Sequence, residues 1–124
     1  MIFGLGTDII EVDRIRKEIS KESGLKEKVF APAEIEYCES KNDKAQHYAA
    51  RFAAKEAFFK ALGTGWGHGI EFQDVMVLNN VQGRPEIKLK GKAHDFFKSN
   101  NLKNIQLSMS HIKELASAFV IIEK

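Results

Sequence analysis

The sequence predicts an α+β fold in which a mostly antiparallel sheet wraps against one long central helix. Segments rich in β-forming residues stand near both ends of the chain, around residues 2–10 and 105–122, and the strongest helical pattern lies between them, over residues 43–62. No internal repeat or Pro/Gly/Ser-rich linker interrupts the 124 residues. A chain of this length commonly forms one domain, so we expect a single domain over residues 1–124.

The first third of the chain predicts one strand and two short helices. Residues 2–10 are short, apolar and rich in β-formers, with two glycines among them. Asp13 is expected to cap a helix that continues to about Ser20 and stops before Gly24. Pro32 suits the first turn of a second helix, which includes residues 33–38.

Residues 43–62 carry the helix on which the fold prediction depends. Apolar and small residues recur at intervals of three, four and seven, so they line one face of this helix: Ala45, Ala49, Phe52, Phe59 and Gly63. Gly63 and Gly65 are expected to end the helix, and residues 64–69 then form a glycine-rich loop.

The second half of the chain predicts two strand pairs separated by a helix. The expected elements are strands over residues 72–78 and 86–89 joined by a turn at 79–85, a helix over 91–100, and strands over 105–110 and 116–122 joined by a turn at 112–114. The turn between the last two strands is expected to be tight.

Composition limits the class of protein and its partners. The hydrophobic fraction of 44% and charged fraction of 29% are ordinary for a globular protein, and the net charge of +2 is too small to indicate nucleic-acid binding. No apolar run approaches the ~18 residues that cross a bilayer, and the N-terminus lacks a signal-peptide pattern. Cys38 is the single cysteine, which fits a reducing compartment. We therefore expect a cytoplasmic protein with neither a membrane nor a nucleic acid as partner.

Basic residues gather early in the chain, among glutamates that dilute them. The cluster comprises Arg14, Arg16, Lys17, Lys21, Lys26 and Lys28. Two interpretations stay open: a solvated helix face, or a docking surface for an acidic partner.

Glu56 is out of place in the long helix. It falls between Phe52 and Phe59 in the apolar stripe, where a hydrophobic residue is expected. A buried carboxylate must be paired, protonated or bound to a metal, because burying it uncompensated is costly. One interpretation is an ordinary i, i+4 pair with Lys60; the other is a metal ligand.

Asp8 is a second acid in an apolar segment. Alternation along the first strand places Gly4, Gly6 and Asp8 on one face, where the glycines are expected to leave open space beside the aspartate. If Asp8 and Glu56 converge, two carboxylates with remaining water positions describe a Mg²⁺ site that awaits phosphate oxygens. The alternative for Asp8 alone is a strand-end cap.

Residues 107–111 (LSMSH) place hydroxyl and imidazole groups at a strand end. No carboxylate stands at a spacing that predicts a nucleophilic triad, so Ser110 and His111 are better candidates for binding a phosphate. The other histidines, His47, His68 and His94, do not indicate a metal cluster. The glycine-rich loop after residue 62 lacks the Lys-Ser/Thr ending of a Walker motif.

Two motifs and their order resemble the holo-[acyl-carrier-protein] synthase family of 4′-phosphopantetheinyl transferases. The motifs are residues 4–11 (GLGTDIIE) and residues 52–60 (FAAKEAFFK), and residues 83–85 (GRP), residues 108–111 (SMSH) and the Ala-rich last strand agree with them. The similarity covers nearly the whole chain. It implies the fold of that family and Mg²⁺-dependent transfer of the 4′-phosphopantetheine arm of coenzyme A to a serine of apo acyl carrier protein, with release of adenosine 3′,5′-bisphosphate, in fatty acid biosynthesis.

The resemblance also implies roles for individual residues. Asp8 and Glu56 match the metal ligands, and Lys60 matches a catalytic lysine that contacts the pyrophosphate. A further set matches or lies near positions that bind the coenzyme: Lys44, Arg51, Lys60, Gly63, Gly83, Arg84, Pro85, Ser110 and His111. The proton acceptor for the carrier serine is expected to be a water, either on the metal or held by Glu56.

The resemblance extends to partners. The family presents its first helix to the acidic carrier protein, and Arg14 is the matching residue here. It also implies a homotrimer with sites between neighbouring subunits. Two other classes remain possible from the residues alone: a catalytically silent module that binds coenzyme A, a nucleotide or a carrier protein, and a structural α+β domain whose acids are only salt-bridged.

Overall fold

The computed structural model describes residues 1–64 and 68–124. Its strands are β1 (Ile2–Glu11), β2 (Val75–Asn79), β3 (Pro85–Leu89), β4 (Asn104–His111) and β5 (Leu115–Glu123). Its α-helices are α1 (Val12–Ile19), α2 (Leu25–Val29), α3 (Pro32–Glu39), α4 (Lys44–Leu62) and α5 (Gly91–Ser99). No helix within this described part of the chain combines the length and apolar character needed to cross a membrane.

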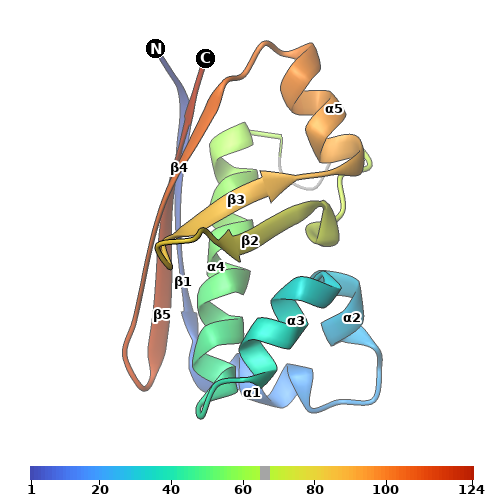
Figure 1. The fold of residues 1–124 in the computed structure, drawn as a ribbon, viewed down its shortest axis with the longest axis vertical. Coiled ribbons are helices and arrows are strands. Elements are labelled where there is room, and N and C mark those ends of the chain that lie inside the picture. Colours follow the sequence, from blue (N-terminus) through green and yellow to red (C-terminus); the bar gives the residue numbers. More distant parts are fainter. Residues whose placement is uncertain (65–67) are drawn as a thin grey trace.

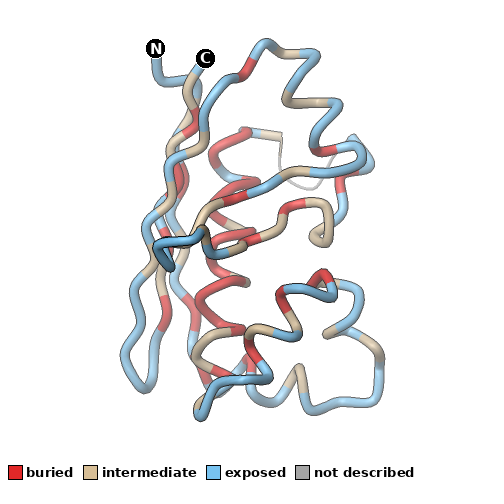
Figure 2. The backbone as a smooth tube through the Cα atoms, in the orientation of Figure 1, coloured by how far each residue is buried: buried red, intermediate tan, exposed pale blue. Residues whose placement is uncertain are grey.

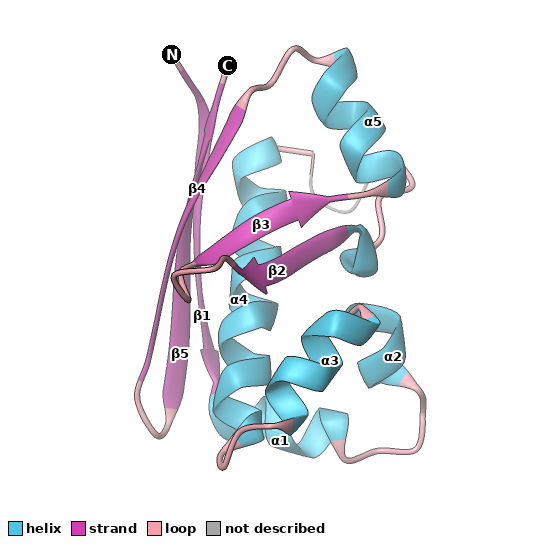
Figure 3. Ribbon diagram, in the orientation of Figure 1, coloured by secondary structure: helices cyan, strands magenta, loops and turns pink. Residues whose placement is uncertain are grey.

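The long helix α4 lies between two antiparallel sheets. A three-stranded sheet of order β1-β5-β4 covers one side, and the β2–β3 hairpin crosses the other side, with α1, α2 and α3 below it and α5 above it in the view of Figures 1 and 3. The two termini lie side by side, since Met1 and Lys124 exchange backbone hydrogen bonds. The predicted α+β class, with a mostly antiparallel sheet against a long central helix, is confirmed.

Glycines in β1 let the backbone of α4 approach the sheet closely. A Cβ at Gly4 would overlap the carbonyl oxygen of Ala61, and a Cβ at Gly6 would overlap that of Ala57 and lie 2.8 Å from the nitrogen of Ala61. The expectation of open space beside Asp8 is therefore wrong, because the backbone of α4 fills that space. The function of the two glycines is to bring β1 and α4 into contact.

Gly6→Ala should therefore destabilise the fold. The added methyl group meets backbone atoms, which cannot rotate away, so we expect a loss of about 3 kcal/mol in the free energy of unfolding. Denaturant titration followed by circular dichroism measures it. Gly83→Ala is the matched control, because Gly83 has open space around its Cβ position and costs only the strain of its φ of 84°. A loss in Gly6→Ala no larger than in Gly83→Ala would contradict the close-packing argument.

Helix α4 is buried around most of its circumference, as Figure 2 shows, rather than along the single predicted stripe. Its alanines allow the sheet and the hairpin to pack on opposite sides. The interior even contains charges: Lys55 is 0% exposed, and its Nζ donates to Glu34 Oε1 at 2.8 Å, to Phe72 O at 2.9 Å and to Val75 O at 2.6 Å.

Local differences from the predicted elements have physical causes. Asp13 does not cap α1; the helix begins at Val12, and Asp13 instead pairs with Arg16 in the first turn. The short α2 carried no sequence signal. The segment Phe72–Asp74 is a 3₁₀ turn, so β2 begins only at Val75. Gly63 ends α4 at a φ of 77°, as predicted, while Gly65 lies outside the described residues.

Candidate active site

The structure brings Asp8, Glu56 and Lys60 together where β1 crosses α4; we call these three residues the carboxylate site. Lys60 Nζ donates to Asp8 Oδ1 at 3.0 Å and to the carbonyl oxygen of Thr7 at 2.9 Å. The predicted alternative, a Glu56–Lys60 pair, does not form. In residues 1–64 and 68–124, no hydrogen bond or ion pair engages the Glu56 carboxylate.

The electrostatics of Glu56 favour the binding of a cation. Burial raises the pKa of Glu56, and the negative charge of Asp8 raises it further, whereas Lys60 and Arg14 act in the opposite direction. The half-buried carboxylate is therefore charged at a cost that a nearby positive ion would remove. Two carboxylates are too few to complete a coordination sphere by themselves. They fit Mg²⁺, which usually keeps several waters and takes further oxygens from phosphates.

Arg14 projects from α1 on the exposed surface next to this site, close enough for its charge to lower the pKa of Glu56. The other early cations divide into two groups. Arg16, Lys21 and Lys26 are paired with acids, at Asp43 (3.3 Å), Glu18 (3.0 Å) and Glu39 (3.7 Å) respectively. Among the described residues, Arg14, Lys17 and Lys28 form no ion pair.

A second cluster of functional groups surrounds the ring of Tyr37, and we call it the Tyr37 cluster. The guanidinium carbon of Arg51 lies 4.1 Å from the ring centroid, and Lys41 Nζ lies 4.6 Å from it. The His47 ring is 5.8 Å from Tyr37 and 5.4 Å from His111. Arg51 is only 3% exposed, and its Nε has no hydrogen-bond partner in the described part of the chain.

The β2–β3 hairpin joins this cluster through Arg51, whose Nη2 donates to Asn79 Oδ1 at 3.2 Å. The turn of the hairpin exposes Gly83 and Arg84 ahead of Pro85, and the side chain of Asn80 fixes it by accepting from the backbone nitrogen of Arg84 at 3.0 Å. Ser110 precedes His111 on the exposed end of β4. Of the predicted coenzyme-binding residues, Arg51 and His111 thus lie in the cluster, and Ser110 is next to His111 in the chain. Gly83, Arg84 and Pro85 belong to the hairpin that contacts Arg51 through Asn79, which pairs with Pro85.

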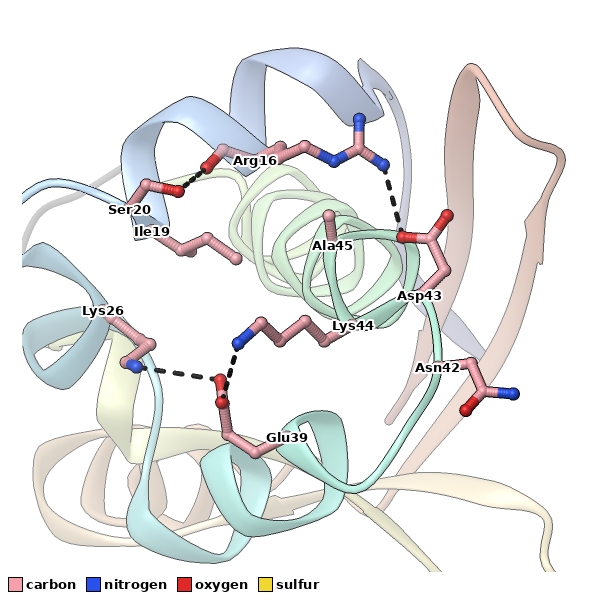
Figure 4. Close-up of a pocket in the computed structure, with 9 residues that line it drawn as sticks. All are labelled: Arg16, Ile19, Ser20, Lys26, Glu39, Asn42, Asp43, Lys44 and Ala45. Carbon is pink, nitrogen blue, oxygen red and sulfur yellow. Dashed lines mark hydrogen bonds and ion pairs between the residues drawn. The ribbon is translucent and has the colours of Figure 1, made fainter.

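Lys44 and Gly63 lie apart from that cluster. Lys44 Nζ donates to Glu39 Oε1 at 3.1 Å inside a cavity of about 320 Å³ between α1, α3 and the start of α4 (Figure 4). Lys26 approaches the same carboxylate from the opposite side. Gly63 stands at the other end of α4, just under one turn beyond Lys60 and so nearer to the carboxylate site.

Comparison with known proteins decides the family. A family model described as the 4′-phosphopantetheinyl transferase superfamily matches residues 4–120. The holo-[acyl-carrier-protein] synthase of Geotalea daltonii is 45% identical over 125 residues, which cover 100% of each chain. The chain belongs to the holo-[acyl-carrier-protein] synthase family of 4′-phosphopantetheinyl transferases. It is an enzyme, and the resemblance seen in its motifs is confirmed.

Solved structures of synthases have the same fold. The synthase from Neisseria meningitidis matches with a TM-score of 0.91 and 31% identity over 100% of each chain. The synthase from Bacillus anthracis, in complex with CoA (3′,5′-ADP), matches with a TM-score of 0.81 and 34% identity over 100% of this chain and 98% of that one.

Sequence reasoning missed several residues of this transferase that surround the predicted site. Tyr37, Lys41 and His47 received no role, although the Tyr37 ring packs against Arg51 and Lys41, and the His47 ring packs against His111. One signal was available: His47 precedes Arg51 by four residues, so both lie on the same side of α4. The contribution of Tyr37 was not visible, because it comes from a different helix.

Proposed function

We propose that this transferase moves the 4′-phosphopantetheine group of coenzyme A to a serine of apo acyl carrier protein, with Mg²⁺ as cofactor and adenosine 3′,5′-bisphosphate as the released product. The observation that carries the proposal is the convergence of Asp8 and Glu56, 48 positions apart in the chain, beside the ammonium group of Lys60. This arrangement supports binding of a diphosphate through a divalent cation.

The two acids hold the metal in this proposal. Lys60 Nζ lies 3.0 Å from Asp8 and partly neutralises it, whereas the Glu56 carboxylate has no partner among residues 1–64 and 68–124. The site therefore accepts further positive charge. When bound, Mg²⁺ supplies charge neutralisation on the diphosphate oxygens and fixes the position of the attacked phosphorus.

Proton transfers fall to the side chains around this site. The Lys60 ammonium is exposed, so it can turn to donate a hydrogen bond to the leaving phosphate, whose negative charge grows as the bond breaks. Glu56, whose pKa is raised by burial and by Asp8, can hold the water that accepts the proton of the carrier serine. Asp8 keeps Lys60 oriented through their hydrogen bond.

The Tyr37 cluster supplies the nucleotide end of the site in this proposal. It contains a buried guanidinium, a lysine and one imidazole around the ring of Tyr37, and a second imidazole, that of His111, packs against the first. Such groups bind phosphate by charge-assisted hydrogen bonds. The hairpin that contacts Arg51 through Asn79 carries Pro85 opposite Asn79, and its exposed turn residues Gly83 and Arg84 are available to the adenosine.

One chain presents these two sites in different directions, which supports a homotrimer with shared sites. Glu56 and Lys60 follow Arg51 by five and nine residues, so they point about 140° and about 180° away from it around the axis of α4. One coenzyme is more easily bound between two subunits than around one helix. The outer face of the three-stranded sheet also exposes apolar residues that a neighbouring subunit would cover: Phe3, Leu5, Ile9, Leu115 and Phe119.

Arg14 supports docking of the acidic carrier protein beside the carboxylate site. It has no acidic partner in the described chain, and it borders an apolar cavity of about 440 Å³ that Ile15, Phe52 and Phe72 help to line. An exposed cation beside an apolar groove fits an acidic, amphipathic partner helix.

Arg14→Glu should weaken carrier binding about tenfold at low salt, because the encounter becomes electrostatically unfavourable. Titration calorimetry with apo carrier protein at two salt concentrations measures the effect, and wild type and variant should converge as salt rises. Lys98→Glu on α5 is the charge-matched control. Equal, salt-independent binding by Arg14→Glu and Lys98→Glu would reject this docking surface.

Mass spectrometry of apo carrier protein incubated with coenzyme A, Mg²⁺ and the transferase tests the proposed function. We expect the carrier to gain the mass of one phosphopantetheine, and to gain nothing when a chelator removes the cation. Coenzyme A binding without any mass gain would instead indicate a silent binding module.

We also propose that residues 1–124 form one domain. We propose a cytoplasmic location as well, which is supported by the single, buried thiol of Cys38.

A further inference from the structure

The Tyr37 cluster collects positive charge without acidic partners. Lys41, His47, Arg51 and His111 form no ion pair with any carboxylate in the described part of the chain. The buried Nε of Arg51 has no acceptor there either. The donors of a buried guanidinium normally all have hydrogen-bond acceptors. The unpaired Nε of Arg51 therefore indicates an anion-binding site.

The charge of the cluster depends on His47. Burial lowers the pKa of His47, the charges of His111, Arg51 and Lys41 lower it further, and Asp43 opposes them weakly. The groups that face His47 come from each neighbouring element: Tyr37 from α3, Lys41 and Asp43 from the α3–α4 connection, and His111 from β4. In the free protein, His47 is therefore held neutral over more of the physiological pH range.

We propose that His47, whose ring packs against that of His111, takes up a proton when the 3′-phosphate of coenzyme A binds beside Arg51, so that coenzyme affinity falls as pH rises. The inference rests on the proposed function, which assigns the diphosphate to Asp8, Glu56 and Lys60. The 3′-phosphate is then the remaining phosphate of coenzyme A. It is a monoester that carries up to two negative charges, and it matches the excess of cations around Tyr37.

The direction of the effect follows from linkage. An anion beside His47 favours the charged imidazolium, so the pKa of His47 is higher in the complex than in the free protein. The added affinity is fully present below the pKa of the free protein and is lost as pH rises through the pKa of the complex. A shift of one pKa unit corresponds to about tenfold in affinity.

Titration calorimetry with coenzyme A on wild type and His47→Phe, from roughly pH 5 to pH 8, tests the proposal. Phenylalanine keeps a ring against Tyr37 and removes the titrating nitrogens. The measured quantity is the ratio of the two dissociation constants at each pH, in which the ionisation of the phosphate itself cancels. We expect His47→Phe to bind about tenfold more weakly at the acidic end and to approach wild type at the alkaline end.

His94→Phe is the matched control, since His94 is exposed on α5 far from this cluster in the sequence, and its ratio to wild type should stay at one throughout. Dephospho-coenzyme A, which lacks the 3′-phosphate, should give equal affinities for wild type and His47→Phe at every pH. If His47→Phe loses its native circular dichroism spectrum, His47→Gln replaces it.

The outcomes are separable. A ratio that does not change with pH overturns the role of His47 while leaving the proposed function standing. A pH-dependent ratio that persists with dephospho-coenzyme A overturns the assignment to the 3′-phosphate. Failure of wild type to bind coenzyme A at any pH overturns the proposed function itself.

Discussion

Asp8→Asn and Glu56→Gln are each expected to lower kcat for phosphopantetheine transfer about a thousandfold. Each replacement keeps the shape of the side chain and removes one negatively charged metal ligand, and metal assistance in phosphoryl transfer contributes several kcal/mol to lowering the barrier. Initial rates measured by mass spectrometry of the carrier protein, at saturating coenzyme A and Mg²⁺, check the expectation. Both variants should keep the wild-type circular dichroism spectrum. Glu56 has no partner to lose within the described residues, and Asp8→Asn keeps the Oδ1 that accepts from the exposed Lys60.

The control for this pair is Glu36→Gln, an equivalent change at an exposed glutamate of α3 that has no ion pair in the described chain. Its rate should equal that of wild type. A near-normal kcat in either Asp8→Asn or Glu56→Gln would mean that the wrong carboxylates have been assigned.

Lys55→Met is expected to destabilise the fold by about 3–5 kcal/mol, because it leaves the Glu34 carboxylate buried without its cation. Both side chains are 0% exposed. Glu34 also accepts from the backbone nitrogens of Ala31 and Val77, each at 3.0 Å, so the pair ties α3 and β2 to the middle of α4. Equilibrium unfolding in urea measures the loss.

Two further variants make this measurement specific. Adding Glu34→Gln to Lys55→Met removes the stranded charge and should recover part of the lost stability. Lys21→Met breaks an exposed pair with Glu18 of similar length, 3.0 Å, and should cost less than about 1 kcal/mol. A loss in Lys55→Met as small as that in Lys21→Met would contradict the importance of the buried pair.

The parts of the fold that depend on local sequence could be predicted. Helix α4 was visible because its apolar residues recur at helical spacing between Asp43, which caps it, and Gly63. The final hairpin was visible from two runs of β-formers around a tight turn. The short α2 was not, because five residues, Leu25–Val29, carry too little periodicity to separate a helix from a loop.

The parts that depend on contacts across the chain could not be predicted. Glu56 looked misplaced and its i, i+4 neighbour Lys60 looked like its partner, yet Lys60 bonds to Asp8 across 52 positions. Lys55 had no predicted role and no predicted burial. Its burial arises because the β2–β3 hairpin packs over that side of α4, where Val75 and Glu34 accept from its ammonium group.

Binding of Mn²⁺ to the protein saturated with coenzyme A, followed by electron paramagnetic resonance, tests most directly whether Asp8 and Glu56 jointly hold one divalent cation against the diphosphate. We expect one ion to bind per coenzyme in wild type, and the binding to weaken at least about tenfold in Asp8→Asn and in Glu56→Gln, with no change in Glu36→Gln. Equal Mn²⁺ affinity in all four proteins would show that the two carboxylates meet without holding a metal.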